Sequence, residues 1–282
     1  MSDPNRRLPG MTTISYSSNV GSIAQHREVA ISLHAVSREF VTSRRSTTAA
    51  LTDVSLDVDA GQFLAIVGPS GCGKSTILRM IAGLDEPSSG TVTIGGDTPA
   101  ALARQHRLGV AFQDHALLPW SSVRRNIELP YRISGQRIDS ARVDHLIDLV
   151  GLNRFGDARP KQLSGGMRQR VSIARSLVLQ PDVLLLDEPF GALDVPTRRR
   201  LNVELASILE TEKTTTVLVT HDIDEAVFLA DHVIVMGTRP GRVVHKEHSE
   251  FERPRTRELT DTSEFITKVG RLTRQLEEGV FD

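Results

Sequence analysis

The chain has 282 residues, 39% of them hydrophobic and 24% charged, and its formal net charge is −1. This composition is typical of a globular protein with a sizeable core, and the near-neutral charge leaves no overall electrostatic footprint for nucleic acid. No apolar run approaches the roughly 18 residues of a membrane-spanning helix, and the N-terminal segment lacks the apolar core of a signal peptide. The single cysteine rules out an internal disulfide. We therefore expect a cytosolic protein, unless a partner holds it at a membrane.

Predicted strands and helices alternate along most of the chain. Residues 1–28 are polar and without periodicity, so we expect a loose tail in which Met11 is an alternative start. Residues 29–250 show the alternation that is typical of an α/β domain with a parallel sheet. Within this domain, residues of about 115–165 lack a strong strand and predict a helical subdomain. Residues 251–282 form a C-terminal extension with one helix.

Apolar periodicity locates the individual elements. The runs that predict strands are 31–36, 51–58, 63–67, 91–94, 108–112, 183–186, 216–220 and 232–236. An apolar stripe from Phe265 to Leu276 predicts the C-terminal helix, and Asp261 and Glu264 resemble its capping pair. The basic run Arg198-Arg199-Arg200 predicts a solvated helix face.

The segment from Gly68 to Ser75 reads GPSGCGKS and fits the phosphate-binding pattern G-x-x-x-x-G-K-[ST]. A predicted strand precedes it and a helical run follows, which is the context that the pattern requires. Glycines let backbone N–H groups close around phosphate oxygens, and the helix start adds free donors. We expect Lys74 to reach the β- and γ-phosphates and Ser75 to ligate Mg²⁺. The predicted nucleotide contacts are Gly68, Pro69, Ser70, Gly71, Cys72, Gly73, Lys74, Ser75 and Thr76.

The position of Cys72 inside this loop suggests a chemical test. We expect a thiol reagent on Cys72 to block nucleotide binding and ATP to protect the thiol.

Two acids end the apolar strand predicted at 183–186. In isolation, Asp187 and Glu188 would be a strand finishing at a solvated turn. After a phosphate loop, however, a strand-end acid is expected to hold Mg²⁺, directly or through water, and Asp187 fits that role. Glu188 points elsewhere and could accept a proton from the attacking water.

A second candidate anion site lies at Ser164-Gly165-Gly166, ahead of an apolar-periodic helix. A serine cap and free N–H groups at a helix start suit a phosphate, although an ordinary serine cap would look the same. One phosphate loop already surrounds one nucleotide's phosphates. A second anion site is therefore easier to explain if it serves a nucleotide held by another copy of the chain.

The phosphate loop, the Leu163-Ser164-Gly165-Gly166 run and the two acids share the order and spacing of one family. The sequence resembles the nucleotide-binding subunits of ABC transporters, from about Ile31 to about Lys246. The resemblance implies an α/β fold: a P-loop NTPase (ABC ATPase) core with an N-terminal antiparallel β layer and a helical subdomain insertion. It also implies an ATPase that uses ATP and Mg²⁺.

The resemblance assigns roles to four further residues. Gln113 resembles the glutamine that senses Mg²⁺ and the attacking water, and Asp194 the loop acid that links two nucleotide sites. His221 resembles the histidine that contacts the γ-phosphate, although it could also be a helix-entry cap. Phe40 resembles the aromatic that stacks on adenine, and a core phenylalanine is its alternative. One departure is Met167, where many members have glutamine; this puts only ribose-side contacts in doubt.

The segment Ala116-Leu117-Leu118-Pro119-Trp120 contains the only tryptophan. By chemistry alone it is an apolar, rigid surface segment, or simply part of the helical packing. In the family, this region docks the membrane subunit. Its form, together with Arg239-Pro240-Gly241 and Pro254-Arg255, resembles the branch that imports nitrate, sulfonates, taurine and similar small solutes. The implied partners are permease subunits near Trp120 and, indirectly, an extracytoplasmic solute-binding protein, with the chain at the cytoplasmic face of the membrane.

The resemblance implies that two copies pair head to tail, so that Ser164 of one closes over ATP on Lys74 of the other. ATP binding would close the pair, and hydrolysis by water activated at Glu188 would reopen it. Other functions stay open: a soluble ABC ATPase of DNA repair or translation, or an exporter or lipid-trafficking ATPase. The soluble proteins usually carry long coiled-coil insertions or two cassettes, which this sequence lacks. A non-catalytic regulatory module is disfavoured, because every expected catalytic residue is present.

Overall fold

A computed structural model describes residues 29–43, 46–191, 193–238 and 240–281. The predicted tail at 1–28 and Arg239 lie outside the described residues. The strands are β1 (Val29–Ser43), β2 (Ser46–Asp59), β3 (Phe63–Val67), β4 (Ser89–Ile94), β5 (Leu108–Ala111), β6 (Val183–Asp187), β7 (Thr215–Thr220), β8 (His232–Gly237) and β9 (Arg242–His248). The α-helices are α1 (Lys74–Ile81), α2 (Pro99–Arg104), α3 (Val123–Ile127), α4 (Leu129–Ser134), α5 (Ser140–Leu149), α6 (Gly165–Leu177), α7 (Val195–Glu212), α8 (Ile223–Leu229) and α9 (Ser263–Phe281). Short 3₁₀ helices are η1 (Asn153–Phe155), η2 (Pro160–Gln162) and η3 (Arg257–Asp261).

Six strands form the central sheet in the order β5-β6-β7-β3-β8-β9. The first five strands are parallel, and β9 returns antiparallel to β8 as an edge strand. Every residue of β3 is buried, as expected for a central strand that is covered on both faces. The predicted α/β core with a parallel sheet is therefore confirmed.

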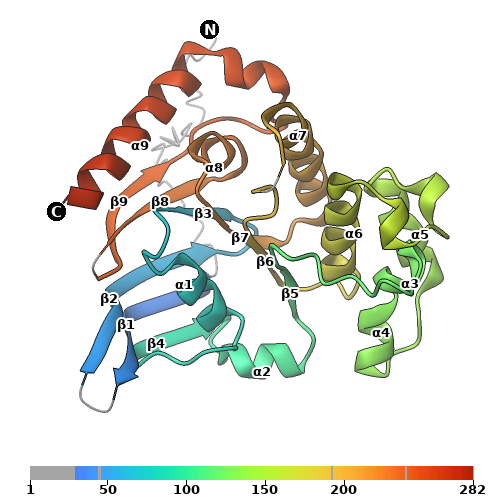
Figure 1. The fold of residues 1–282 in the computed structure, drawn as a ribbon, viewed down its shortest axis with the longest axis horizontal. Coiled ribbons are helices and arrows are strands. Elements are labelled where there is room, and N and C mark those ends of the chain that lie inside the picture. The colour runs from blue at the N-terminus through green and yellow to red at the C-terminus, as the bar shows by residue number, and fades with distance from the viewer. Residues whose placement is uncertain (1–28, 44–45, 192, 239, 282) are drawn as a thin grey trace, which may run out of the picture.

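Alternate residues of the central strands enter two different hydrophobic cores. On β3, Phe63 and Ala65 pack with α6, α7 and α8, whereas Leu64 and Ile66 pack with α1 and the antiparallel sheet. This division follows from the two-residue period of a strand. The sheet is thus the middle layer of the molecule, with helices on one face and a mixed layer on the other (Figure 1).

The antiparallel layer contains β2, β1 and β4, in that order. It joins the central sheet at Gly241, whose N–H donates to the Ala50 carbonyl at 3.0 Å. The Gly241 carbonyl accepts from the Thr52 N–H at 2.9 Å. A Cβ on Gly241 would lie 2.0 Å from the Cys72 carbonyl oxygen, so glycine allows the turn before β9 to press against the phosphate loop.

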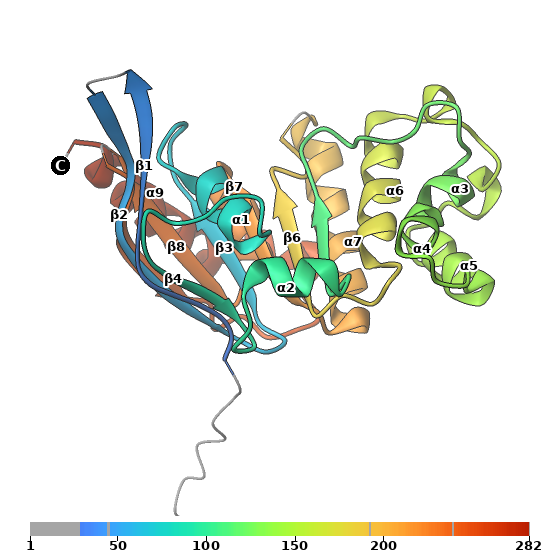
Figure 2. The same ribbon diagram turned by 90° about the horizontal axis from the view of Figure 1, so that it is seen from below.

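Helices α3, α4 and α5 gather beyond α6, at the end of the molecule away from the antiparallel sheet (Figure 2). The fully buried Asn126 of α3 fixes the segment before this group. Its side-chain amide exchanges hydrogen bonds with the Leu118 N–H and carbonyl at 2.8 and 3.2 Å. The segment that contains Trp120 is therefore held by a defined turn.

The C-terminal extension ends in α9, which packs on β8 and α8 (Figure 1). The Thr262 hydroxyl, not Asp261, accepts the Phe265 N–H at 3.3 Å, so the expected capping pair of Asp261 and Glu264 is wrong. None of the helices in the described part of the chain is long and apolar enough to cross a bilayer.

Candidate nucleotide site

The phosphate loop connects the end of β3 to the start of α1, as the sequence predicts. Gly73 is the N-cap residue of α1, with φ 96°. That left-handed conformation is costly for any residue with a Cβ, and a Cβ here would also lie 2.4 Å from Leu51 Cδ2. The N-terminal N–H groups of α1 therefore open into a loop that only a glycine at this position permits.

The Lys74 side chain lies inside the loop and is 6% exposed. Its Nζ donates to the carbonyl oxygens of Gly68 at 2.8 Å and Pro69 at 3.1 Å. An ammonium held against the backbone of this loop is placed where phosphate oxygens would meet both the charge and the N–H donors.

Ser75 and Asp187 come together from different elements. The Ser75 hydroxyl, in the first turn of α1, donates to Asp187 Oδ1 at the end of β6 at 3.4 Å. Burial, and then the neighbouring charge of Glu188, raise the pKa of Asp187. A hydroxyl and a carboxylate are oxygen ligands that suit Mg²⁺, and a divalent cation would relieve the repulsion between the two acids. The donor set therefore fits the ion.

Glu188 and His221 meet beyond the ends of β6 and β7, which are neighbouring parallel strands. His221 Nδ1 lies 3.3 Å from Glu188 Oε2. The Glu188 N–H donates to the Val219 carbonyl at 2.8 Å, and its φ of 44° is rare for a residue with a side chain. The backbone turn thus places the Glu188 carboxylate beside the histidine.

The Cys72 side chain does not face the predicted nucleotide. It is fully buried in the core that packs α1 against the antiparallel layer, and burial raises the pKa of its thiol. This burial argues against a thiol that reagents reach, whereas protection by ATP stays a prediction. Cys72 can contribute to the phosphate loop only through its backbone.

Three residues assigned by resemblance are exposed. Gln113 follows β5, which pairs with β6, so it leaves the sheet at the same edge as Asp187. The Asp194 carboxylate caps α7 by accepting the Thr197 N–H at 3.3 Å, and this contact with Thr197 lowers its pKa. Phe40 is 41% exposed, with the Arg38 guanidinium 4.9 Å from its ring centroid. This exposure rules out the core alternative for Phe40.

Ser164 is the N-cap of α6, and its hydroxyl accepts the Met167 N–H at 3.2 Å. Gly165 and Gly166 begin the helix beside Leu193 and Leu201, respectively. Both views of the fold place α6 apart from α1, with β5 and β6 between them (Figures 1 and 2). The structure of one chain therefore does not bring Ser164 to the phosphate loop.

Two arginines hold the loops of this site, and no motif in the sequence marks either role. Arg175 of α6 donates to the carbonyls of His115 at 2.7 Å and Ala116 at 2.8 Å, which ties α6 to the segment after Gln113. Arg198 forms an ion pair with Asp222, so the predicted solvated face is wrong at this residue. Helical geometry could have signalled this, because three consecutive residues turn through about 200° and cannot share one face.

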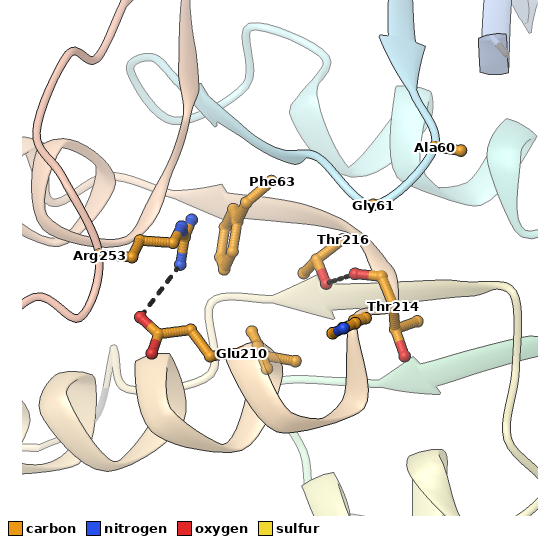
Figure 3. A pocket seen from close by; sticks show the side chains of 9 residues that line it. Ala60, Gly61, Phe63, Glu210, Thr214, Thr216 and Arg253 are labelled. Carbon is orange, nitrogen blue, oxygen red and sulfur yellow. Dashed lines mark hydrogen bonds and ion pairs between the residues drawn. The ribbon is translucent and has the colours of Figure 1, made fainter. Parts of the chain in front are cut away.

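A separate pocket of about 420 Å³ lies at the amino ends of the parallel strands β3 and β7, away from the carboxyl ends that carry the phosphate loop and Asp187 (Figure 3). Phe63 and Thr216 line it, and Arg253 of the C-terminal extension reaches Glu210 across it at 3.8 Å. Ligands of open α/β sheets bind at the carboxyl ends of the strands. This pocket is therefore not part of the nucleotide site.

The comparisons with known proteins agree with this geometry. The model of the ABC transporter family matches residues 51–191. The nitrate import ATP-binding protein NrtD of Synechococcus elongatus is 45% identical over 76% of this chain and 79% of its own length. This chain belongs to the ABC transporter family. The aliphatic sulfonates import ATP-binding protein SsuB of Bacillus subtilis is 43% identical over 81% of the chain and 89% of its own length.

Among solved structures, a dimeric post-hydrolysis state of the ATP-binding cassette MJ0796 with ADP and Pi aligns with a TM-score of 0.68. It is 32% identical, and the alignment covers 79% of this chain and 100% of that one. The predicted family and fold are confirmed, and the chain is a nucleotide-binding ATPase.

Proposed function

We propose that the chain is the ATP-hydrolysing subunit of an importer for a small solute such as nitrate, an aliphatic sulfonate or taurine. One observation carries this proposal: identities of 43% and 45% to sulfonate- and nitrate-import ATP-binding proteins extend over about three quarters of the chain or more. The alternatives are a soluble ABC ATPase and an exporter or lipid-trafficking ATPase. The chain would lie at the cytoplasmic face of the membrane, attached to permease subunits.

In this proposal, two chains pair head to tail and hold ATP between them. Lys74 and the loop from Gly68 to Thr76 bind the phosphates, and Phe40 stacks on adenine. Ser164 and the adjacent glycines of the second chain close the site, because the helix that they begin, α6, lies apart from α1 within its own chain (Figure 2). The dimeric state of the MJ0796 cassette supports this arrangement.

Glu188 would accept a proton from the attacking water, and His221 would contact the γ-phosphate. Their separation of 3.3 Å supports a shared role at one reacting group. Ser75, Asp187 and Gln113 would hold Mg²⁺, which neutralises phosphate charge when bound. Asp194 would link the two nucleotide sites from the start of α7.

The permease would dock beside the helical group. An open groove of about 410 Å³ has an apolar lining that includes Phe112, Leu129 and Ile133. Trp120 lies between Phe112 and Leu129 in the sequence and is 69% exposed. It belongs to the turn that Asn126 fixes. Exposed apolar side chains on a rigid support are typical of a protein interface.

We therefore expect Trp120→Ala to weaken copurification with the permease at least about tenfold, while basal ATP hydrolysis changes less than about twofold. Ile266→Ala, at a residue that is 60% exposed on α9, is the matched control. A larger loss of hydrolysis than of permease binding would make Trp120 a packing residue.

The import function is tested in proteoliposomes that contain the chain together with a candidate permease and solute-binding protein from the same genome. We expect ATP-dependent accumulation of nitrate, ethanesulfonate or taurine, and none with Glu188→Gln. ATP hydrolysis without accumulation of any of the three, or with efflux instead, would favour the alternatives.

A further inference from the structure

The turn after β7 and the loop before α7 are joined by one side chain. Arg198 of α7 forms an ion pair with Asp222, the residue that follows His221. The two side chains are only 17% and 23% exposed, so the pair is partly shielded from solvent. Such charge-assisted contacts are stronger than those of fully exposed pairs.

The same guanidinium also contacts the loop that carries Asp194. Arg198 Nη2 donates to the Leu193 carbonyl at 3.1 Å, and the Arg198 N–H donates to the Asp194 carbonyl at 2.9 Å. One planar group therefore bridges the two loops. The fork of donors in arginine is suited to this bridging.

Hydrogen bonds with Thr220 and Glu225 fix the turn at Asp222. The Asp222 N–H donates to the Thr220 hydroxyl at 3.0 Å, and Asp222 Oδ1 accepts the Glu225 N–H at 3.1 Å. Thr220 donates in turn to the carboxylate of Glu225, which is 2% exposed. His221 lies between Thr220 and Asp222, so a displacement of Asp222 reaches the histidine through one peptide unit.

We propose that Arg198 is a positioning residue that makes the placement of His221 against Glu188 depend on the position of the Asp194 loop. This inference rests on the proposed function, in which Asp194 links the two nucleotide sites of a pair of chains. Movement of that loop on pairing would then reach His221 through Leu193, Arg198 and Asp222. Hydrolysis would be fast only where the partner chain is in place.

The test compares Arg198→Ala with Arg199→Ala in single-turnover ATP hydrolysis. Arg199 is the next residue of α7, but it is 51% exposed and its closest acid is Asp224 at 4.0 Å. We expect Arg198→Ala to lower the hydrolysis rate at saturating ATP about tenfold or more, with the Kd for ATP changed less than about twofold. Arg199→Ala should leave both values unchanged. Arg198→Lys should recover part of the rate, because an ammonium can pair with Asp222 without reaching both loops.

A double-mutant cycle with His221→Ala separates positioning from simple stability. If Arg198 acts through His221, Arg198→Ala should lower the residual rate of His221→Ala by less than about twofold. Additive losses, or a rise in the Kd for ATP at an unchanged rate, would overturn the role of Arg198. The wild type in the same series tests the pairing itself: full hydrolysis by a chain that light scattering shows to be a monomer with ATP bound would remove the proposed pair of chains, and this inference with it.

Discussion

At Glu225 the protein keeps a carboxyl group in an environment that opposes its ionisation. Burial raises its pKa from 4.5 to about 7, and the charges of Asp222 and Glu188 act in the same direction. The hydrogen bond from Thr220 and the charge of Arg198 lower it, but they are outweighed. This balance has a measurable consequence for stability, because the unfolded chain would ionise Glu225 near its ordinary pKa.

Between about pH 4.5 and 7, the folded chain retains a proton at Glu225 that the unfolded chain loses. Stability therefore falls as the pH rises through this window, by roughly 3 kcal/mol at most, and the contribution is constant above it. We expect Glu225→Gln to remove this loss, because an amide can still accept the Thr220 hydroxyl. Urea unfolding at pH 5.5 and 8 measures the effect. An equal pH dependence in the variant and the wild type would show that Glu225 is ionised when folded.

The burial of Cys72 leads to a second prediction for a single side chain. A thiol that is fully buried and has a raised pKa offers little thiolate to a reagent. The test uses a disulfide reagent that releases a coloured thiolate when it reacts with a cysteine. We expect it to label the native chain at least about a hundredfold more slowly than the chain unfolded in concentrated urea. ATP should have little further effect. Fast labelling that ATP prevents would return Cys72 to the nucleotide site.

Residue identities at the site could be predicted because they follow strands in a fixed pattern. Lys74, Ser75 and Asp187 stand at a loop and at strand ends that the sequence marks clearly, and the structure brings the last two within 3.4 Å. The direction of a side chain depends on local dihedral angles and on neighbours that are distant in sequence. That is why the burial of Cys72 and the inward turn of Arg198 were missed.

At the scale of elements, apolar periodicity predicted every strand of the central sheet except the antiparallel edge strand β9. Its seven residues, RVVHKEH, are mostly half-exposed and polar, so they lack a buried-strand pattern. The start of α9 was harder to predict, because Asp261 and Thr262 are both good N-caps. Only the backbone conformation decides which of the two side chains accepts a hydrogen bond from the first turn of the helix.

The C-terminal extension is attached to the core through a buried arginine. The Arg255 side chain donates to the carbonyls of Phe228 at 2.9 Å and Ala230 at 2.8 Å, and burial lowers its pKa to about 10. Asp231 lies within 3.5 Å and supplies a counter-charge. The carbonyls at the end of α8 therefore depend on a donor from outside their own helix.

We expect Arg255→Ala to destabilise the chain by about 2 to 4 kcal/mol, because it leaves these buried carbonyls without their donor. The exposed Arg257 is the matched control, and Arg257→Ala should cost less than about 0.5 kcal/mol. Urea unfolding midpoints measure both values. Similar midpoints for the two variants would show that the extension is not fixed by Arg255.

In the whole molecule, the helices that carry the two candidate anion sites, α1 and α6, lie on opposite sides of β5 and β6 (Figures 1 and 2). Two features of the sequence, the phosphate loop and the serine-glycine turn, predicted that a second copy would be needed to unite them. The relative position of the two sites could not be predicted from either motif, because it depends on the strand order. Periodicity identifies strands but does not order them in a sheet.

Mixing two defective variants tests whether the sites are shared between chains. Lys74→Ala removes the phosphate contact and Ser164→Ala the closing contact, so each variant alone should hydrolyse ATP poorly. In a mixed pair, however, one site combines the intact Lys74 of one chain with the intact Ser164 of the other. If the two sites work independently, an equal mixture should recover up to about a quarter of the wild-type rate, because about half of the pairs are mixed and each has one intact site. If each chain used its own Ser164, every site would keep one defect, and the mixture would be no more active than the average of the two variants.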